Sequence, residues 1–478
     1  MTQREKRGVQ ENLVIIGGGL AGLAAAEQAS DANHNLRVIV MEPAGRPGGV
    51  LGTVAHEGWL VERSADCFLA ARPEGVELVA RLGLNDQLIG VDPRVRRALV
   101  WHRGRTVPVP RGFRLLAPGR IAGILTTPLL SPTGRLRVLA ERWIARRTVG
   151  EESLEEFTVR RLGREAFDRL VQPLASGIWT ADPARLGMAA ACPEFVAMER
   201  DHGSLWAGEQ ARLRGQLPAG DAAGARYGQF VTFSQGMETL PLRLAERLRQ
   251  RGIEFIQARV ERVTRSDGSW SVMARRAEGG ELEAYRTSAV IVAVPAPAAA
   301  LMLADVDAGL AAELAGIDYA GSAIVSLGFR REDVAHPLDA AGLVVPWIAG
   351  RRALAVSFSS SKFPGRAPQG CVLMRVFLGG ALDPAAVKLD DEALASLAIA
   401  ETQALLGTRG CPQFQRVDRW ASAMPQYHLG HAARVARIEA AVAGHERLAL
   451  AGSAYRGVGI PQVIASGQAA ARSVTLPG

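Results

Sequence analysis

The chain has 478 residues, of which 48% are hydrophobic and 22% are charged, and its formal net charge is +8. This composition predicts an ordered globular protein of two or three domains and excludes a disordered or fibrous chain. All but three of the 56 basic residues are arginine, spread along the chain without a recognisable nucleic-acid-binding motif, so we expect no nucleic-acid partner. An acidic small molecule or an anionic membrane surface fits the charge better.

The cysteines and the N-terminus indicate the cellular compartment in which the protein is expected. Cys67, Cys192, Cys371 and Cys411 are widely separated and form no metal-like pattern with histidine, so we expect free thiols and no metal. Residues 1–11 are polar, unlike a secretory signal, and no run of about twenty uncharged apolar residues occurs anywhere in the sequence. We expect a cytoplasmic protein, with peripheral contact to the cytoplasmic face of the inner membrane left open.

A strand, a glycine turn and a helix are predicted at the start of the chain. Residues 13–16 are apolar and lead into Gly17-Gly18-Gly19-Leu20-Ala21-Gly22, after which a helical pattern begins. Such an order is typical of a dinucleotide site, because the glycines allow a tight turn, close approach of a pyrophosphate and close helix packing. A second apolar run delivers Glu42 twenty residues after Gly22, where a carboxylate accepts hydrogen bonds from a ribose.

The residues that follow Glu42 favour FAD over NAD. Arg46, Gly48 and Gly49 suit a large cofactor that continues past the ribose, because glycines permit close backbone approach and arginine supplies a planar charge for phosphate. NAD enzymes do not require this second element. We therefore predict a FAD site.

The later elements suggest a discontinuous organisation. Arginines alternate with bulky apolar residues in 111–150, which fits a helical unit in a membrane interface and an ordinary helical domain equally well. A helix is predicted at 242–251, and strands at 253–263, 270–272, 289–294, 322–329, 354–358 and 371–378. A strand at 447–452, a glycine-rich turn and a helix from Gln462 supply a second positive helix end for the flavin or the pyrophosphate.

These elements together predict an α/β fold with three units. A discontinuous Rossmann-like FAD-binding domain is expected from 10–92, 226–297 and 441–478. A helical domain, inserted or membrane-associated, is expected at 110–212. A mixed α+β substrate-binding domain is expected from 93–109, 213–225 and 298–440.

The glycine motif, Glu42 with the Arg46 segment, and the C-terminal turn resemble the FAD amine-oxidase-type flavoprotein superfamily. More narrowly, the chain resembles the oxygen-dependent protoporphyrinogen and coproporphyrinogen oxidases. This narrower resemblance rests on Gly58-Trp59-Leu60-Val61-Glu62, on residues 176–183, on Arg419 to Tyr427 with its Met-Pro-Gln-Tyr ending, and on Tyr455-Arg456-Gly457-Val458-Gly459-Ile460-Pro461. These segments are spread across nearly the whole chain.

The resemblance implies roles for particular residues. For the cofactor it implies the phosphate loop Gly17 to Gly22, the ribose acid Glu42, the pyrophosphate side Arg46, Gly48 and Gly49, the flavin segment Ala65 and Asp66, the adenine contact Val260, the aromatic Trp420, and the closing turn Gly452, Val458, Gly459 and Ile460. For the substrate it implies that Arg97 faces a propionate and that Gly177 lies close to the tetrapyrrole. Three segments depart from the family pattern: Ser64-Ala65 replace Gly-Pro, Ala181 replaces a glycine and narrows the expected substrate space, and Glu238 interrupts a glycine turn.

The implied reaction is oxidation of a porphyrinogen in heme biosynthesis, by three hydride transfers to flavin N5, with dioxygen as acceptor and hydrogen peroxide as product. Flavin can take a hydride without a strong protein base, so we name no catalytic residue. Sequence does not separate protoporphyrinogen IX from coproporphyrinogen III, and a homodimer is left open. The alternatives are an amine oxidase, a desaturase, or a non-catalytic FAD-binding paralogue. Amine oxidases keep a lysine beside the flavin, and neither Lys362 nor Lys388 lies in a motif that matches this lysine.

Overall fold

The computed structural model describes residues 12–147, 150–214, 230–276 and 280–475. The polar segment 1–11 and most of the linking segment 213–225 lie outside the described residues. Within the described ranges, no helix combines the length and the apolar character that crossing a bilayer requires.

A five-stranded parallel sheet contains the first predicted strand and brings distant parts of the chain together. Its strands, in spatial order, are β12 (Glu254–Ile256), β2 (Arg37–Met41), β1 (Asn12–Ile16), β16 (Ala289–Val292) and β22 (Leu448–Leu450). These strands are apolar on both faces, which is expected of a sheet covered on both sides. One face packs on α1 (Leu20–Ala32), α11 (Thr239–Gln250) and α17 (Ile460–Thr475), and the other on β13 (Ala258–Ser266), β14 (Ser269–Arg276) and β15 (Leu282–Thr287).

Three further helices pack on the same sheet. They are α12 (Ala296–Leu303), α13 (Ala308–Ala315) and α16 (His431–Ala443), and their buried side chains share a core with β1, β2 and β16. We call the sheet with all its covering elements the parallel-sheet unit. The domain division stays a prediction, and this packing favours a cofactor-binding domain that extends into 298–318 and 431–440.

Smaller elements connect this unit to the rest of the chain. They are β3 (Thr53–His56), β4 (Trp59–Glu62), β5 (Phe68–Leu69), α2 (Pro73–Arg81), β6 (Leu88–Gly90) and β11 (Phe230–Phe233). β11 pairs with both β5 and β6. The β3–β4 hairpin reaches a second, larger sheet, because the Trp59 ring stacks on Phe414 with 5.5 Å between ring centroids.

The second sheet has seven strands. In spatial order they are β21 (Phe414–Pro425), β17 (Tyr319–Arg330), β20 (Cys371–Gly379), β19 (Ala353–Ser357), β18 (Gly342–Val344), β7 (Ala98–His102) and β8 (Arg105–Pro108). Helix α15 (Asp391–Leu406) covers one face through an apolar core. The alternate side chains therefore point away from α15, and among them Val344, Ala355 and Phe377 are neighbours across β18, β19 and β20.

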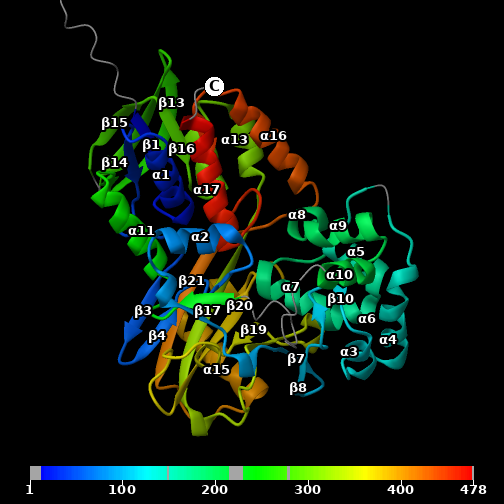
Figure 1. The fold of residues 1–478 in the computed structure, drawn as a ribbon. Coiled ribbons are helices and arrows are strands. Elements are labelled where there is room, and N and C mark those ends of the chain that lie inside the picture. Colours follow the sequence, from blue (N-terminus) through cyan, green and yellow to red (C-terminus); the bar gives the residue numbers. More distant parts are fainter. Residues whose placement is uncertain (1–11, 148–149, 215–229, 277–279, 476–478) are drawn as a thin grey trace, which may run out of the picture.

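The third part of the fold is helical, as predicted for this stretch. It contains α3 (Ile121–Thr126), α4 (Pro132–Leu139), a short helix η3 (Ala140–Trp143), α5 (Leu154–Leu162), α6 (Arg164–Ala166), α7 (Gln172–Trp179), α8 (Met188–Ala191), α9 (Pro193–His202) and α10 (Leu205–Arg214). Figure 1 shows these helices gathered beside the seven-stranded sheet, away from β13–β15. Helix α7 of this helical unit contacts both β18 and β19, so it brings the residues around Gly177 to the sheet face opposite α15.

Candidate cofactor and substrate site

The glycine motif forms the turn between β1 and α1. Gly17 has φ +109°, and a Cβ there would lie 2.6 Å from the Ala293 carbonyl oxygen. A Cβ at Gly22 would collide with the Gly17 carbonyl, so these two glycines are needed for the turn and for helix packing. At Gly19 the nearest atom to an added Cβ is the Gly49 Cα at 4.0 Å. The N-terminus of α1 is therefore open on this side, where a pyrophosphate fits.

Glu42 lies at the end of β2, beside this turn. Its carboxylate accepts hydrogen bonds from the backbone N–H groups of Gly18 and Ala44, at 2.8 and 2.9 Å. Two bonds fix the orientation of the carboxylate and leave acceptor sites free, since an ionised carboxylate has about four. The half-buried Glu42 is thus placed to accept from ribose hydroxyls next to the phosphate loop.

Arg46 shapes the second loop of the site. Its guanidinium donates to the carbonyl oxygens of Gly49 and Leu51, at 2.7 and 2.9 Å, and lies 3.4 Å from the Glu238 carboxylate. The loop then meets the first turn where the Gly48 N–H donates to the Gly18 carbonyl at 2.8 Å. Arg46 therefore acts on the shape of the loop, and its charge is shared with Glu238.

The unexpected Glu238 fits its position. It immediately precedes α11 with a φ of −64°, a conformation that needs no glycine, and its carboxylate accepts from the Thr53 N–H at 3.2 Å. The residue that does need to be glycine is Gly236, with φ +96° and a Cβ that would clash with the Thr53 side chain. The departure at Glu238 thus leaves the turn intact.

A line of accessible residues continues from these loops to Ala65. Gly49 and Val50 are exposed, and the Val50 carbonyl accepts from the Ser64 hydroxyl at 2.7 Å. Ala65 follows and is exposed as well. The accessible residues that begin at the N-terminus of α1 and pass Gly49 thus end at Ala65, and an extended dinucleotide is expected along them.

The segment Arg63–Asp66 is fastened to the seven-stranded sheet. The Arg63 side chain pairs with Asp418 at 2.9 Å, and the Arg63 carbonyl accepts from Trp420 Nε1 at 2.9 Å. Asp66 is ion-paired with Lys362 at 2.8 Å. Two of the expected flavin residues, Trp420 and Asp66, thus hold the segment on which Ala65 is presented.

The C-terminal turn is held by Tyr427. Its hydroxyl donates to the Ser453 carbonyl at 2.6 Å and accepts from the Gly457 N–H at 2.7 Å. The ring stacks on His431, with 4.0 Å between ring centroids, and burial raises the pKa of the hydroxyl above its usual range. Tyr427 thus connects the Met-Pro-Gln-Tyr segment to the turn that leads into Val458, Gly459 and α17.

Two other expected cofactor residues occupy separate places. Gly452 lies two residues after β22 with φ +133°, and its N–H donates to the Ser466 hydroxyl of α17 at 3.0 Å. Val260 is buried on β13 with Ile39 and Met41, at an irregularity in the pairing of β13 with β14. Val260 therefore lies against β2, the strand that delivers Glu42.

On the substrate side, Gly177 lies next to Val344, and Val458 packs against the apolar cluster that contains Val344. Gly177 is exposed, and an added Cβ would lie 3.8 Å from the Val344 Cγ1 atom. Val458, Ile178 and Ala355 are half-buried and pack on the same cluster as Val344. Ala181 is only 3% exposed, so its methyl group contributes to the core of the helical unit.

Arg97 is engaged elsewhere. Its Nε donates to the Asp339 carbonyl at 2.9 Å, and its Nη2 pairs with the Asp339 carboxylate. Within the part of the chain that the structure describes, no hydrogen bond or ion pair connects the Arg97 side chain with the region around Gly177. A substrate carboxylate would therefore have to compete with Asp339 for this guanidinium.

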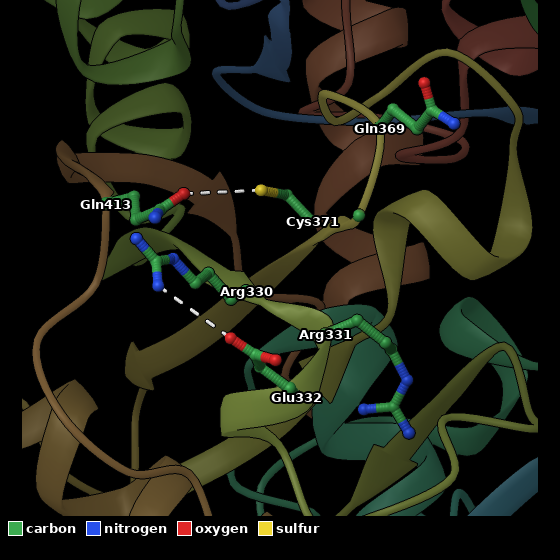
Figure 2. A pocket seen from close by; sticks show the side chains of 7 residues that line it. Arg330, Arg331, Glu332, Gln369, Cys371 and Gln413 are labelled. Atoms are coloured by element: carbon green, nitrogen blue, oxygen red, sulfur yellow. Dashed lines mark hydrogen bonds and ion pairs between the residues drawn. The ribbon is translucent and has the colours of Figure 1, made fainter.

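A hollow of about 540 Å³ lies far from these residues. It is lined by residues that include Arg330, Cys371 and Gln413. The Cys371 thiol donates a hydrogen bond to the Gln413 side-chain oxygen at 3.3 Å, and Figure 2 shows these two side chains pointing toward each other. Arg330 pairs with Cys371 at one end of β17, whereas Trp420 pairs near the other end. This hollow is therefore separate from the candidate site.

Sequence reasoning did not single out Tyr427, Lys362 or Arg375. Tyr427 lay in a segment used only for the resemblance, and Lys362 matched no motif. One signal was available for Lys362: lysine occurs only three times in this arginine-rich chain. Arg375 carried no comparable signal, because arginines are common throughout.

The fold and the site define a flavoprotein with a dinucleotide-binding sheet and a second sheet against it. A family model, flavin containing amine oxidoreductase, matches residues 20–475. The chain belongs to this flavin-containing amine oxidoreductase family, and the predicted α/β fold and FAD cofactor are confirmed.

Individual relatives are similar over nearly the full length. A coproporphyrinogen III oxidase of Bacillus subtilis is 31% identical, over 96% of this chain and 97% of the relative. One of Propionibacterium freudenreichii is 32% identical, over 97% and 90%. A solved structure from Exiguobacterium sp. 255-15, provisionally named a protoporphyrinogen oxidase, is 27% identical with a TM-score of 0.84, over 97% of this chain and 98% of that one.

The two hydrogen bonds of the Tyr427 hydroxyl lead to a testable prediction about FAD binding. Tyr427→Phe leaves the Ser453 carbonyl and the Gly457 N–H without their partner, at a cost of about 1–3 kcal/mol. If this cost falls on the turn that binds FAD, the Kd for FAD rises about tenfold, measured by quenching of flavin fluorescence as apoprotein is added.

Tyr455→Phe is the matched control. The Tyr455 hydroxyl is buried and has no hydrogen-bond partner among the residues that the structure describes, so its removal leaves no group unpaired. We expect an unchanged Kd. Equal Kd values for both variants would show that Tyr427 does not shape the cofactor site.

Proposed function

We propose that this protein uses FAD to oxidise a porphyrinogen to the porphyrin. The observation that carries the proposal is one apolar cluster that includes Val344, against which both Ile178 of helix α7 and Val458 of the C-terminal turn pack. This cluster joins the turn expected at the flavin to the helix expected at the substrate. A macrocycle with peripheral carboxylates suits an apolar surface of this kind. The names of the two bacterial relatives support the same substrate class.

The residues of the chain then have positioning roles. Bound FAD supplies an acceptor for two electrons in each of three successive oxidations, with dioxygen as the final acceptor and hydrogen peroxide as product. Gly17 to Gly22 and Glu42 bind its nucleotide half, and the segment ending at Ala65 lies beside its ring. Helix α7 and the Val344 face of the seven-stranded sheet hold the substrate and exclude water.

Coproporphyrinogen III is the preferred substrate in this proposal, because the relatives of at least 31% identity named above are coproporphyrinogen III oxidases. The test is anaerobic mixing of the FAD-loaded protein with coproporphyrinogen III and, separately, protoporphyrinogen IX. We expect bleaching of the flavin and, after air is admitted, porphyrin fluorescence rising faster than autoxidation. No bleaching with either substrate would refute the proposal.

The homodimer stays a prediction, to be checked by light scattering.

Oxidation of an amine is the second candidate function. The observation that favours it is the position of Lys362, which is 8% exposed and paired with Asp66 next to Ala65. Amine oxidases keep a lysine beside the flavin. Flavin bleaching by a panel of primary and secondary amines, without bleaching by porphyrinogens, would select this alternative.

Arg97 is proposed to bind a substrate propionate. Arg97→Ala then removes a charge-assisted contact of about 1.5–3 kcal/mol, which raises KM about tenfold or more and leaves FAD retention unchanged. Asp339→Asn is the complementary variant, because it releases the guanidinium from its present partner and is expected to lower KM. An unchanged KM in Arg97→Ala would remove Arg97 from the substrate site.

We further propose that the helical unit contacts a membrane surface. Exposed apolar side chains lie on consecutive, contacting elements: Leu125 on α3, Leu136 on α4 and Trp143 on η3, with exposed fractions of 47%, 65% and 70%. Arg111 and Arg120, at a hollow beside α3, are also exposed. Apolar groups flanked by arginines suit an anionic interface.

The membrane proposal predicts weaker vesicle binding for a double variant. Leu136→Ser with Trp143→Ser removes two apolar contacts worth about 1.5–3 kcal/mol each when buried, so cosedimentation with phosphatidylglycerol–phosphatidylcholine vesicles should fall at least tenfold. Leu301→Ser is the control, because Leu301 is 79% exposed on α12 of the parallel-sheet unit. Equal loss in both proteins, or no loss in the double variant, would contradict the proposed contact.

A further inference from the structure

Two cations surround one carboxylate directly behind Ala65. The Asp66 carboxylate accepts from Lys362 Nζ at 2.8 Å and lies 3.4 Å from Arg375 Nη1. The side chains are 14%, 10% and 1% exposed, in the order Asp66, Lys362 and Arg375. They come from three separate elements: the segment after β4, helix α14 (Ser359–Lys362) and strand β20.

All three groups of this Asp66 cluster are charged. Burial by itself would raise the pKa of Asp66, but Lys362 and Arg375 hold that pKa well below its usual range. Burial would lower the pKa of Lys362, but Asp66 raises it above its usual value. The Cys67 thiol beside them stays neutral, because burial and Asp66 both raise its pKa. The cluster thus carries one surplus positive charge.

The neighbouring charges do not cancel this surplus. Glu62 and Arg366 are both buried and lie 3.7 Å apart, and they neutralise each other as far as Glu62 is ionised, since burial raises its pKa. In addition, Arg375 Nε and the Ser326 hydroxyl are buried and have no hydrogen-bond partner in the described part of the chain. A purely structural ion pair is expected to be neutral and fully bonded, because an uncompensated buried charge is destabilising.

The surplus positive charge lies close to the place proposed for the flavin ring. Ala65 precedes Asp66 in the chain and is the exposed end of the line that starts at the N-terminus of α1. The Arg375 Nη2 atom donates to the Ser64 carbonyl, so the cluster holds the backbone on which Ala65 is presented. Uptake of two electrons and one proton by the flavin ring adds one negative charge. A fixed cation nearby, in a water-poor site, stabilises that charge.

We propose that Lys362 and Arg375, oriented by Asp66, are positioning residues that raise the reduction potential of the bound flavin. This inference rests on the proposed place of the flavin ring beside Ala65 and not on the identity of the substrate. Its test needs no porphyrinogen, so it can fail independently of the proposed activity.

The experiment is an anaerobic redox titration of the FAD-loaded protein against a reference dye, with wild type, Lys362→Gln and Lys388→Gln compared. Glutamine keeps a donor for Asp66 but removes the charge. We expect the ratio of reduced to oxidised flavin at a given potential to fall about tenfold, equivalent to about 30 mV for a two-electron couple. Lys388 is exposed, so removing the same charge there should leave the potential unchanged.

Two further variants test the sign of the effect. Lys362→Arg keeps the charge and should retain the wild-type potential. Asp66→Asn increases the surplus positive charge and should shift the potential in the opposite direction to Lys362→Gln. An unchanged potential in Lys362→Gln, or shifts of the same sign in Lys362→Gln and Asp66→Asn, would overturn the proposal. Loss of FAD by Lys362→Gln but not by Lys362→Arg would also overturn it, because the charge would then act on binding.

Discussion

The segment Arg63–Asp66 is held from two sides, and the relative placement of the cofactor and substrate regions depends on this clamp. On one side the Arg63 N–H donates to the Gly52 carbonyl at 2.8 Å and the Ser64 hydroxyl donates to the Val50 carbonyl. On the other side Trp420 and Asp418 of the seven-stranded sheet bind Arg63. The clamp therefore fixes the seven-stranded sheet against the loops that lead from the N-terminus of α1.

The contacts of the clamp are polar although much of it is buried, and polar contacts permit only one alignment of the two sheets. Apolar contacts between two sheets tolerate sliding, whereas charge-assisted hydrogen bonds require one alignment of donors and acceptors. Asp418 is 1% exposed and is shared by Arg63 and Arg416, and Asp66 is shared by Lys362 and Arg375. Each carboxylate thus has two cations, so a displaced Arg63–Asp66 segment would leave buried charges unpaired.

The C-terminal turn is placed by an independent set of contacts. Tyr427 follows β21 of the seven-stranded sheet, and its hydroxyl bonds to Ser453 and Gly457 beyond β22 of the parallel-sheet unit. A second connection between the two sheets results. Helix α7 then reaches the Val344 face from the helical unit, so all three parts of the fold contribute to one region.

The sequence by itself determined the local units: the strand at 13–16 with its glycine turn and the helix that begins after it, the acid at Glu42, and the strand and turn near the C-terminus. These follow from contacts between residues close in the chain, because apolar periodicity and glycine conformation are local properties. The family resemblance placed Trp420 and Asp66 near the flavin but gave them no partners. Only the tertiary structure decided that Asp66 meets Lys362, 296 residues away, because that contact depends on how β19 and β20 align in the sheet. Likewise, the pairing of Arg97 with Asp339 could not be predicted from the sequence around Arg97, since the partner carboxylate lies 242 residues further along the chain.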